Sequence, residues 1–173
     1  MNVLVTAASK HGATMGIAEA IAEEMTLQGL SVEVKPIEDV STLSQYDAVV
    51  LGSAIYFGHW LKSAVEFADV FFPELSEMPV WLFSSGPVEE TSDPHASSSS
   101  PEAPPIKGPL KPRDHQIFTG ALNKDQLNLA ERTMMRAIHA DYGDFRDWDA
   151  VRLWATSIAA ALNGRTHART GTP

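Results

Sequence analysis

The sequence predicts an α/β fold in which helices cover both faces of a parallel sheet, and two observations lead to this prediction. Short apolar segments alternate along the chain with longer segments in which apolar residues recur every third or fourth position. One short segment, residues 47–53, is a continuous apolar run of the kind found in strands buried on both faces. Strands and helices that alternate in this way form parallel sheets with right-handed crossovers.

Five strands are predicted. The first begins at Val3 and the third is the apolar run just described. The second, residues 31–35, alternates apolar and polar side chains, as expected for an edge strand with one exposed face. The last two span residues 78–85 and 116–121.

Four helices accompany these strands. In the first, Ile17, Ile21 and Met25 recur every fourth residue, and Gly29 is placed to end the helix. Residues 59–72 and about 125–139 also carry apolar side chains at helical spacing. The last helix is predicted to begin at Trp148 behind an Asp147 cap and to end at Gly164.

Residues 1–163 therefore read as a single domain, followed by a polar tail at residues 164–173. One segment inside the domain has a different composition, because residues 86–114 contain a run of serines and many prolines. Such a segment buries too little apolar surface to offset the entropy of ordering it, so we expect a long mobile surface loop.

Composition excludes several classes of function. The chain has 173 residues, 44% of them apolar, which suffices for a full core, and it has no cysteine. Disulfides, thiolate metal sites and redox thiols are therefore excluded, and any redox role must belong to a bound cofactor. The formal net charge of −9 argues against a nucleic-acid partner.

The chain also contains no apolar segment long enough for an integral membrane segment. Its first residues read as a core strand and carry no basic leader, so we expect a cytoplasmic location.

A loop of small residues between the first strand and the first helix is a candidate phosphate site. Its backbone N–H groups are accessible to an anion, and the following helix adds its positive end. The two glycines, Gly12 and Gly16, form neither a dinucleotide-binding nor an ATP-binding signature. The alternative is an ordinary turn capped by Thr14. The candidate residues are Ser9, Lys10, His11, Gly12, Ala13 and Thr14.

The loop after the third strand is rich in aromatic residues. The predicted strands suit the flavodoxin-like order 2-1-3-4-5, in which a ligand binds between the ends of strands one and three. Residues 52–60 begin at that point, and Tyr56, Phe57 or Trp60 could supply a flat apolar wall for a planar ring. The alternative is that these aromatic rings pack under the following helix.

Four segments together resemble the flavodoxin-domain family that includes the menaquinone-dependent protoporphyrinogen oxidases. They are residues 9–14, 52–59 and 119–122 and the helix start at Asp147 and Trp148. The resemblance implies a three-layer sandwich that binds FMN, with its phosphate on residues 9–14. The residues that it places around the flavin ring are Ala54, Ile55, Tyr56, Phe57, Gly58, His59, Ser85 and Gly86. Residues 120–123 would approach the ring, and no catalytic side chain or metal ligand is implied.

Three functions remain open. The first is an electron carrier with a non-covalent flavin, whose partner is a redox protein or a quinone-linked small molecule. The second is a menaquinone-linked protoporphyrinogen dehydrogenase, although residues 123–126 open an evenly charged helix where such enzymes look basic and aromatic. The third is an interaction module of the same fold that no longer binds FMN, because alanines stand where many flavodoxins carry hydroxyl residues.

Two other classes are rejected. A phospho-receiver domain needs acidic residues after its first and third strands, and this chain has Ala7, Ala8 and Ser53 there. A nucleophilic hydrolase needs the G-x-S-x-G sequence, and neither Ser53 nor Ser85 lies in one.

Overall fold

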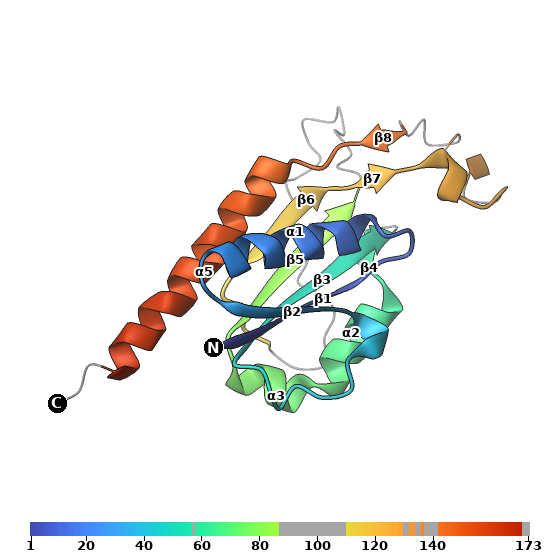
Figure 1. Cartoon of the computed structure of the whole chain (residues 1–173). Helices are drawn as coiled ribbons and strands as arrows, with labels where there is room; N and C mark the ends of the chain where they lie inside the picture. The colour runs from blue at the N-terminus through green and yellow to red at the C-terminus, as the bar shows by residue number, and fades with distance from the viewer. Residues whose placement is uncertain (57, 87–109, 130–131, 134–135, 137–141, 171–173) are drawn as a thin grey trace, which may run out of the picture.

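The strands of the central sheet lie in the order that the sequence predicts. The computed structural model describes residues 1–56, 58–86, 110–129, 132–133, 136 and 142–170. The parallel strands, in spatial order, are β2 (Ser31–Pro36), β1 (Asn2–Ala8), β3 (Ala48–Tyr56), β5 (Val80–Gly86) and β6 (His115–Thr119) (Figure 1). Counted along the chain this is the order 2-1-3-4-5, so the predicted flavodoxin-like three-layer sandwich is confirmed.

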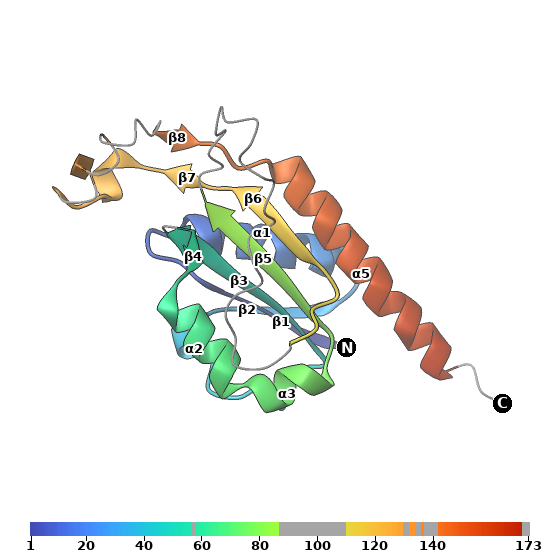
Figure 2. The ribbon, with the colours of Figure 1, turned by 180° about the vertical axis from the view of Figure 1, so that it is seen from behind.

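Helices cover the two faces of the sheet, as Figures 1 and 2 show from opposite sides. The helices α1 (Ala13–Leu27) and α5 (Trp148–Thr170) pack on one face, and α2 (Lys62–Val70) and α3 (Phe72–Glu77) pack on the other. Alternate side chains of β1 supply both cores, because Val3 and Val5 face α1 while Leu4 faces the α2 layer. A short 3-10 helix, Ile37–Asp39, joins the second core.

The end of α1 is as predicted. Gly29 has a φ of 87°, in the left-handed region, and its N–H donates to the carbonyl oxygen of Thr26 at 2.9 Å. The chain then enters β2, whose partner on one side is β1 and whose other edge ends the sheet, so the predicted edge strand is confirmed.

The prediction of one helix over residues 59–72 is wrong. His59–Trp60 instead forms β4, which pairs antiparallel with the end of β3, and the helix begins only at Lys62. Gly58, with a φ of 77°, allows the chain to reverse between the two strands. The helix then stops at Val70, because Pro73 has no N–H with which to continue it, and α3 begins a new axis.

Three strand boundaries also differ from the prediction. β3 runs on to Tyr56, β5 begins at Val80, and β6 ends at Thr119. Thr119 is paired with Gly86, the last residue of β5, so the two parallel strands end together. The chain then forms a separate antiparallel pair of β7 (Ala121–Leu122) and β8 (Gly143–Asp144), which the sequence pattern did not predict.

The last helix begins as predicted and continues further than predicted. Asp147 Oδ1 accepts a hydrogen bond from the N–H of Ala150 at 2.9 Å, which is an N-cap contact. Gly164 is not among the described glycines with positive φ, so it does not end the helix, which reaches Thr170. No helix in the described ranges is long and apolar enough to span a bilayer.

Several predictions concern residues outside the described ranges. These are Phe57, residues 87–109 of the proline- and serine-rich segment, residues 171–173 of the tail, and residues 130–131, 134–135 and 137–139 of the helix expected at residues 125–139. The predicted start of that helix at about Asp125 is wrong, because Lys124–Gln126 forms a 3-10 helix that ends at an extended Leu127, and helical residues follow at 129, 132, 133 and 136. The domain limits and the mobile loop stay predictions.

Close packing between β3 and β5 gives a first testable prediction. A Cβ added at Gly52 would lie 2.1 Å from Cζ of the buried Phe83 ring. We expect Gly52→Ala to lower the free energy of unfolding by about 2 to 3 kcal/mol, because a rigid ring in a packed core has nowhere to move. Urea unfolding of the purified variant measures this change.

Gly164→Ala is the matched control, because no heavy atom lies within 4 Å of a Cβ built there. Alanine in a helix should raise the free energy of unfolding by about 0.5 to 1 kcal/mol. Equal effects of the two substitutions would contradict the packing described for Gly52.

Candidate functional site

The carboxyl ends of the parallel strands meet at one edge of the sheet. Ala8 at the end of β1 is paired with Ser53, Ala54 is paired with Ser85, and Gly86 is paired with Thr119. Each candidate segment of the sequence leaves the sheet from this edge. Topology therefore brings together residues that lie more than a hundred positions apart in the chain.

The first candidate segment, residues 9–14, connects β1 to α1. Gly12 occupies the N-cap position with a φ of 81°, and no side chain caps the helix end. The helical ladder starts with the N–H of Gly16, which donates to the carbonyl oxygen of Gly12 at 2.9 Å. The N–H groups of the three residues between them therefore have no partner within the helix.

This geometry excludes one interpretation of the loop. Thr14 is buried inside the first helical turn, so a turn capped by Thr14 is wrong. The first turn also contains no acidic residue that would compete for its N–H groups. Gly12 at the N-cap is exposed, and Ser9, Ala13 and Met15 around it are half-buried. Unpaired N–H groups at a helix N-terminus are donors of the kind that bind anions.

The second candidate segment is a hairpin formed by β3 and β4. Ala54, Ile55 and Tyr56, which were expected in a loop, lie on β3, while Gly58 and His59 are exposed at the turn and the start of β4. Residue pairing extends from Ile55 with Trp60 to Tyr56 with His59. The side chain of Tyr56 is half-buried at this edge.

One contact joins the two segments. The Nζ atom of Lys10 lies 5.3 Å from the centroid of the Tyr56 ring, which is a cation–π distance. Lys10 belongs to the small-residue loop and Tyr56 to the aromatic hairpin. The structure thus brings the predicted phosphate loop and the predicted ring-binding segment side by side.

The third candidate segment ends β5. Ser85 is buried and Gly86 is half-buried. A Cβ added at Gly86 would lie 3.1 Å from Cβ of Ile55, and one added at Gly120 would lie 3.3 Å from Oγ of Ser85. The ends of β3, β5 and β6 are therefore packed tightly together. Gly120 thus reaches the same edge as the other candidates.

A buried polar chain lies beneath the hairpin, and the sequence did not reveal it. Trp60 Nε1 donates to Ser84 Oγ at 2.8 Å, and Ser84 Oγ lies 2.8 Å from His115 Nε2. Trp60 is 8% exposed, so of the described aromatic residues of this segment only Tyr56 remains available to a ligand. In the sequence His115 is one of several scattered histidines. The available signal was Ser84, a hydroxyl residue that directly follows the apolar residues 80–83 of β5.

Burial lowers the pKa of His115 below its usual range, and the nearby Asp114 carboxylate opposes this shift without reversing it. A neutral ring with its proton on Nδ1 accepts a hydrogen bond from the Ser84 hydroxyl at Nε2, while Ser84 Oγ accepts from Trp60. A protonated ring would make both neighbours of Ser84 donors. The Ser84 oxygen could accept both of those hydrogen bonds, but its own hydroxyl proton would then lose His115 as acceptor.

Arg146 is the second functional candidate that the sequence did not reveal. Its side chain forms an ion pair with Asp144, with 2.6 Å between Nη2 and Oδ2. The guanidinium hydrogen bonds hold the pKa of the Asp144 carboxyl below its usual range. The guanidinium also reaches the first turn of α1, next to residues 9–14. The sequence around it, an Asp and a Trp two positions to either side, was the available signal.

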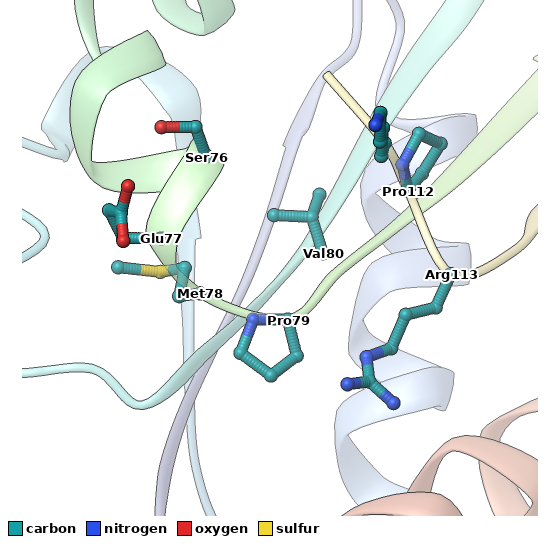
Figure 3. A pocket seen from close by; sticks show the side chains of 8 residues that line it. Ser76, Glu77, Met78, Pro79, Val80, Pro112 and Arg113 are labelled. Carbon is teal, nitrogen blue, oxygen red and sulfur yellow. The ribbon is translucent and has the colours of Figure 1, made fainter. Parts of the chain in front are cut away.

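The two hollows that stand out on the described surface lie at the opposite edge of the sheet. One, of about 300 Å³, is lined by residues 76–80 and 111–113 at the amino end of β5 (Figure 3). The other, of about 380 Å³, is lined by the starts of β1 and β2 together with Gln45 and Tyr46. The candidate site is therefore assigned from the loops at the carboxyl edge and not from a hollow.

Comparison with known proteins gives a consistent result. A family model for the flavodoxin domain matches residues 4–149. The chain is 23% identical over 172 residues to protoporphyrinogen IX dehydrogenase (quinone) of Escherichia coli (strain K12), covering 92% of this chain and 95% of that protein. A protein of the same name from Leishmania major is 25% identical over 155 residues, covering 83% of this chain and 67% of that protein.

Solved structures show the fold. A flavodoxin from the domain Archaea superposes with a TM-score of 0.58 at 15% identity, covering 94% of this chain and 99% of that one. At this identity the similarity concerns the three-layer arrangement and not the ligand. The shared arrangement is the one that extends from β1 to α5.

The buried histidine gives a second testable prediction. Because the pKa of His115 is lowered in the folded protein, the unfolded chain binds more protons as the pH falls below the ordinary histidine pKa of about 6.5. Stability should therefore decrease from pH 7.5 toward pH 5 more steeply in the wild-type protein than in His115→Gln. Thermal unfolding of both proteins across this range measures the difference, and parallel curves would contradict the burial effect.

Proposed function

Because this chain belongs to the flavodoxin domain family, we propose that it binds FMN non-covalently at the carboxyl edge of its sheet and carries electrons through it. The observation that supports this most directly is the contact of Lys10 with Tyr56. It joins a loop suited to a phosphate with a segment suited to a flat ring. A cytoplasmic location and a redox protein as partner are part of the proposal.

The phosphate end would rest on residues 9–14. The N–H groups of the first turn of α1 supply donors, and the positive end of the helix favours a dianion. The hydroxyl groups of Ser9 and Thr14 would add further donors. The ammonium group of Lys10, which is exposed, lies on the Tyr56 ring and adds positive charge on the same side.

The ring end would rest on the β3–β4 hairpin and on the end of β5. Tyr56 offers an aromatic face, and the turn at Gly58 leaves backbone groups accessible to the polar edge of a flavin. Ser85 and Gly86 would border the other side, since Gly86 packs against Ile55. Trp60, Ser84 and His115 hold the hairpin from beneath and would fix its position.

When bound, FMN supplies one-electron and two-electron transfer, so that no nucleophilic side chain is needed. The role of this chain would be to hold the ring against Tyr56 and to exclude water from one of its faces. The net charge of −9 would steer the protein toward a basic partner.

A second candidate function is supported by the relatives. The Escherichia coli protein called protoporphyrinogen IX dehydrogenase (quinone) is covered over 95% of its length, which fits an enzyme of the same layout. In that case a quinone-linked substrate would approach the flavin at the hairpin formed by β7 and β8. We rank it second, because the identity is only 23%.

Binding of FMN can be tested by titration, because flavin fluorescence is quenched when the ring stacks on an aromatic side chain. We expect the purified protein to quench FMN, and the double variant Ser9→Ala, Thr14→Ala to bind at least about 10-fold more weakly, since the loss of even one charge-assisted hydrogen bond costs about 1.5 kcal/mol or more. Riboflavin, which has no phosphate, should bind both proteins equally.

The matched control is Thr42→Ala, Ser44→Ala, which removes the same two hydroxyl types from an exposed loop. It should bind FMN like the wild-type protein. A colourless protein that leaves FMN fluorescence unchanged would instead support the module that has lost its cofactor.

The electron carrier and the dehydrogenase can be distinguished by whether the protein accelerates the oxidation of protoporphyrinogen. An electron carrier loaded with FMN and chemically reduced should pass electrons to cytochrome c. It should oxidise protoporphyrinogen with a menaquinone analogue no faster than free FMN at the same concentration. Porphyrin fluorescence measures the second rate, and turnover well above that of free FMN would favour the dehydrogenase.

A further inference from the structure

Arg146 occupies a position between the β7–β8 hairpin and the start of α1. Its Nε donates to Asp144 Oδ1 at 2.8 Å and its Nη2 donates to Asp144 Oδ2 at 2.6 Å. This two-point contact fixes the plane of the guanidinium. Its side chain is only 18% exposed, although arginine is ordinarily a surface residue.

The remaining terminal nitrogen reaches the helix that follows the phosphate loop. Arg146 Nη1 donates to the carbonyl oxygen of Ala13 at 3.3 Å. A Cβ added at Gly16 would lie 2.7 Å from the same nitrogen. Glycine inside a helix costs about 1 kcal/mol relative to alanine. The absence of a side chain at Gly16 is therefore what lets the guanidinium approach the helix.

Two further contacts hold Arg146 in place. Its Cζ lies 4.4 Å from the centroid of the Trp148 ring, so the guanidinium stacks on an aromatic face. The preceding residue is tied to the end of β6, because Phe145 N–H donates to the carbonyl oxygen of Gly120 at 3.1 Å and the Thr119 hydroxyl donates to the carbonyl oxygen of Phe145. Arg146 and its neighbour Phe145 thus link the end of β6 to the first helix.

The charge of this group favours an anion nearby. A cation at the N-terminus of a helix is unfavourable, because the helix end is itself positive. Asp144, on β8, compensates for part of this positive charge. The first turn of α1 has no acidic residue of its own. A dianion at this helix end would interact favourably with both the helix and the guanidinium.

Resting on the proposed function, we infer that Arg146 is a positioning residue that holds the first turn of α1, and with it residues 9–14, in the geometry that binds the phosphate of FMN. It acts through Ala13 and Gly16 and needs no direct contact with the ligand. In this inference, the β7–β8 pair and residues 9–14 hold each other in position through Arg146.

The test compares FMN with riboflavin on the apoprotein. We expect Arg146→Met to raise the Kd for FMN about 10-fold and to change the Kd for riboflavin by less than about 2-fold, since only the phosphate end is affected. Arg146→Lys should show the same loss, because lysine keeps the charge but lacks the planar fork. A wild-type affinity ratio in Arg146→Lys would overturn the positioning role.

Gly16→Ala tests the same inference without removing the arginine. The new methyl group would displace the flexible end of Arg146, and alanine favours the helix, so thermal unfolding should occur at an equal or higher temperature. The Kd for FMN should nevertheless rise at least about 3-fold with the Kd for riboflavin unchanged, which a merely structural role would not produce. This variant remains informative if Arg146→Met does not fold.

Arg152→Met is the matched control, since Arg152 is 54% exposed on α5 and pairs only loosely with Asp149 at 3.5 Å. It should leave both affinities unchanged. If the wild-type protein prefers FMN to riboflavin but Arg146→Met and Gly16→Ala keep that preference, this inference alone is wrong. If the wild-type protein binds neither molecule, the proposed function is wrong and the inference falls with it.

Discussion

The parallel pairing of β1 with β3 determines where everything else at the candidate site lies. Their register sets Ala8 opposite Ser53, so that the loop leaving one strand starts beside the hairpin leaving the other. The chain between these strands must cross over through α1 and β2, which explains why the two segments are distant in sequence. The interaction of Lys10 with Tyr56 is the side-chain consequence of that register.

The site edge is supported differently on its two sides. Under the hairpin the support is polar, a hydrogen-bonded chain from Trp60 through Ser84 to His115. On the other side β1 packs on α1 through purely apolar contacts such as Val5 with Ile17 and Ile21. Apolar packing tolerates small shifts, whereas a buried polar chain has one satisfied arrangement. The β3–β4 hairpin is therefore positioned more precisely than the β1–α1 side of the site.

Much of the fold could be predicted from the sequence because strands and helices differ in their apolar periodicity. The run at residues 47–53 and the repeat of Ile17, Ile21 and Met25 identify a buried strand and a helix, and the alternation of five such strands with helices matches the flavodoxin-like order that the sheet adopts. Periodicity did not reveal β4, because two residues are too few to establish a period. Nor did it predict that α5 continues past Gly164, because a glycine can either continue a helix or end it.

The candidate site was predictable only where it depends on local sequence. A loop of small residues before a helix is visible in the sequence, and so is a cluster of aromatic residues after a strand. Arg146 carries a local signal in its neighbours Asp144 and Trp148, but its approach to α1 depends on Gly16, a residue on another element that lacks a side chain. Contacts between distant segments have no signature within either segment alone.

The pairing of β7 with β8 closes the base of residues 123–142 with two residue pairs, Ala121 with Asp144 and Leu122 with Gly143. Arg146 lies beyond that base. A change in the length or composition of the stretch between Leu122 and Gly143 would therefore leave Arg146 in place as long as these two residue pairs form.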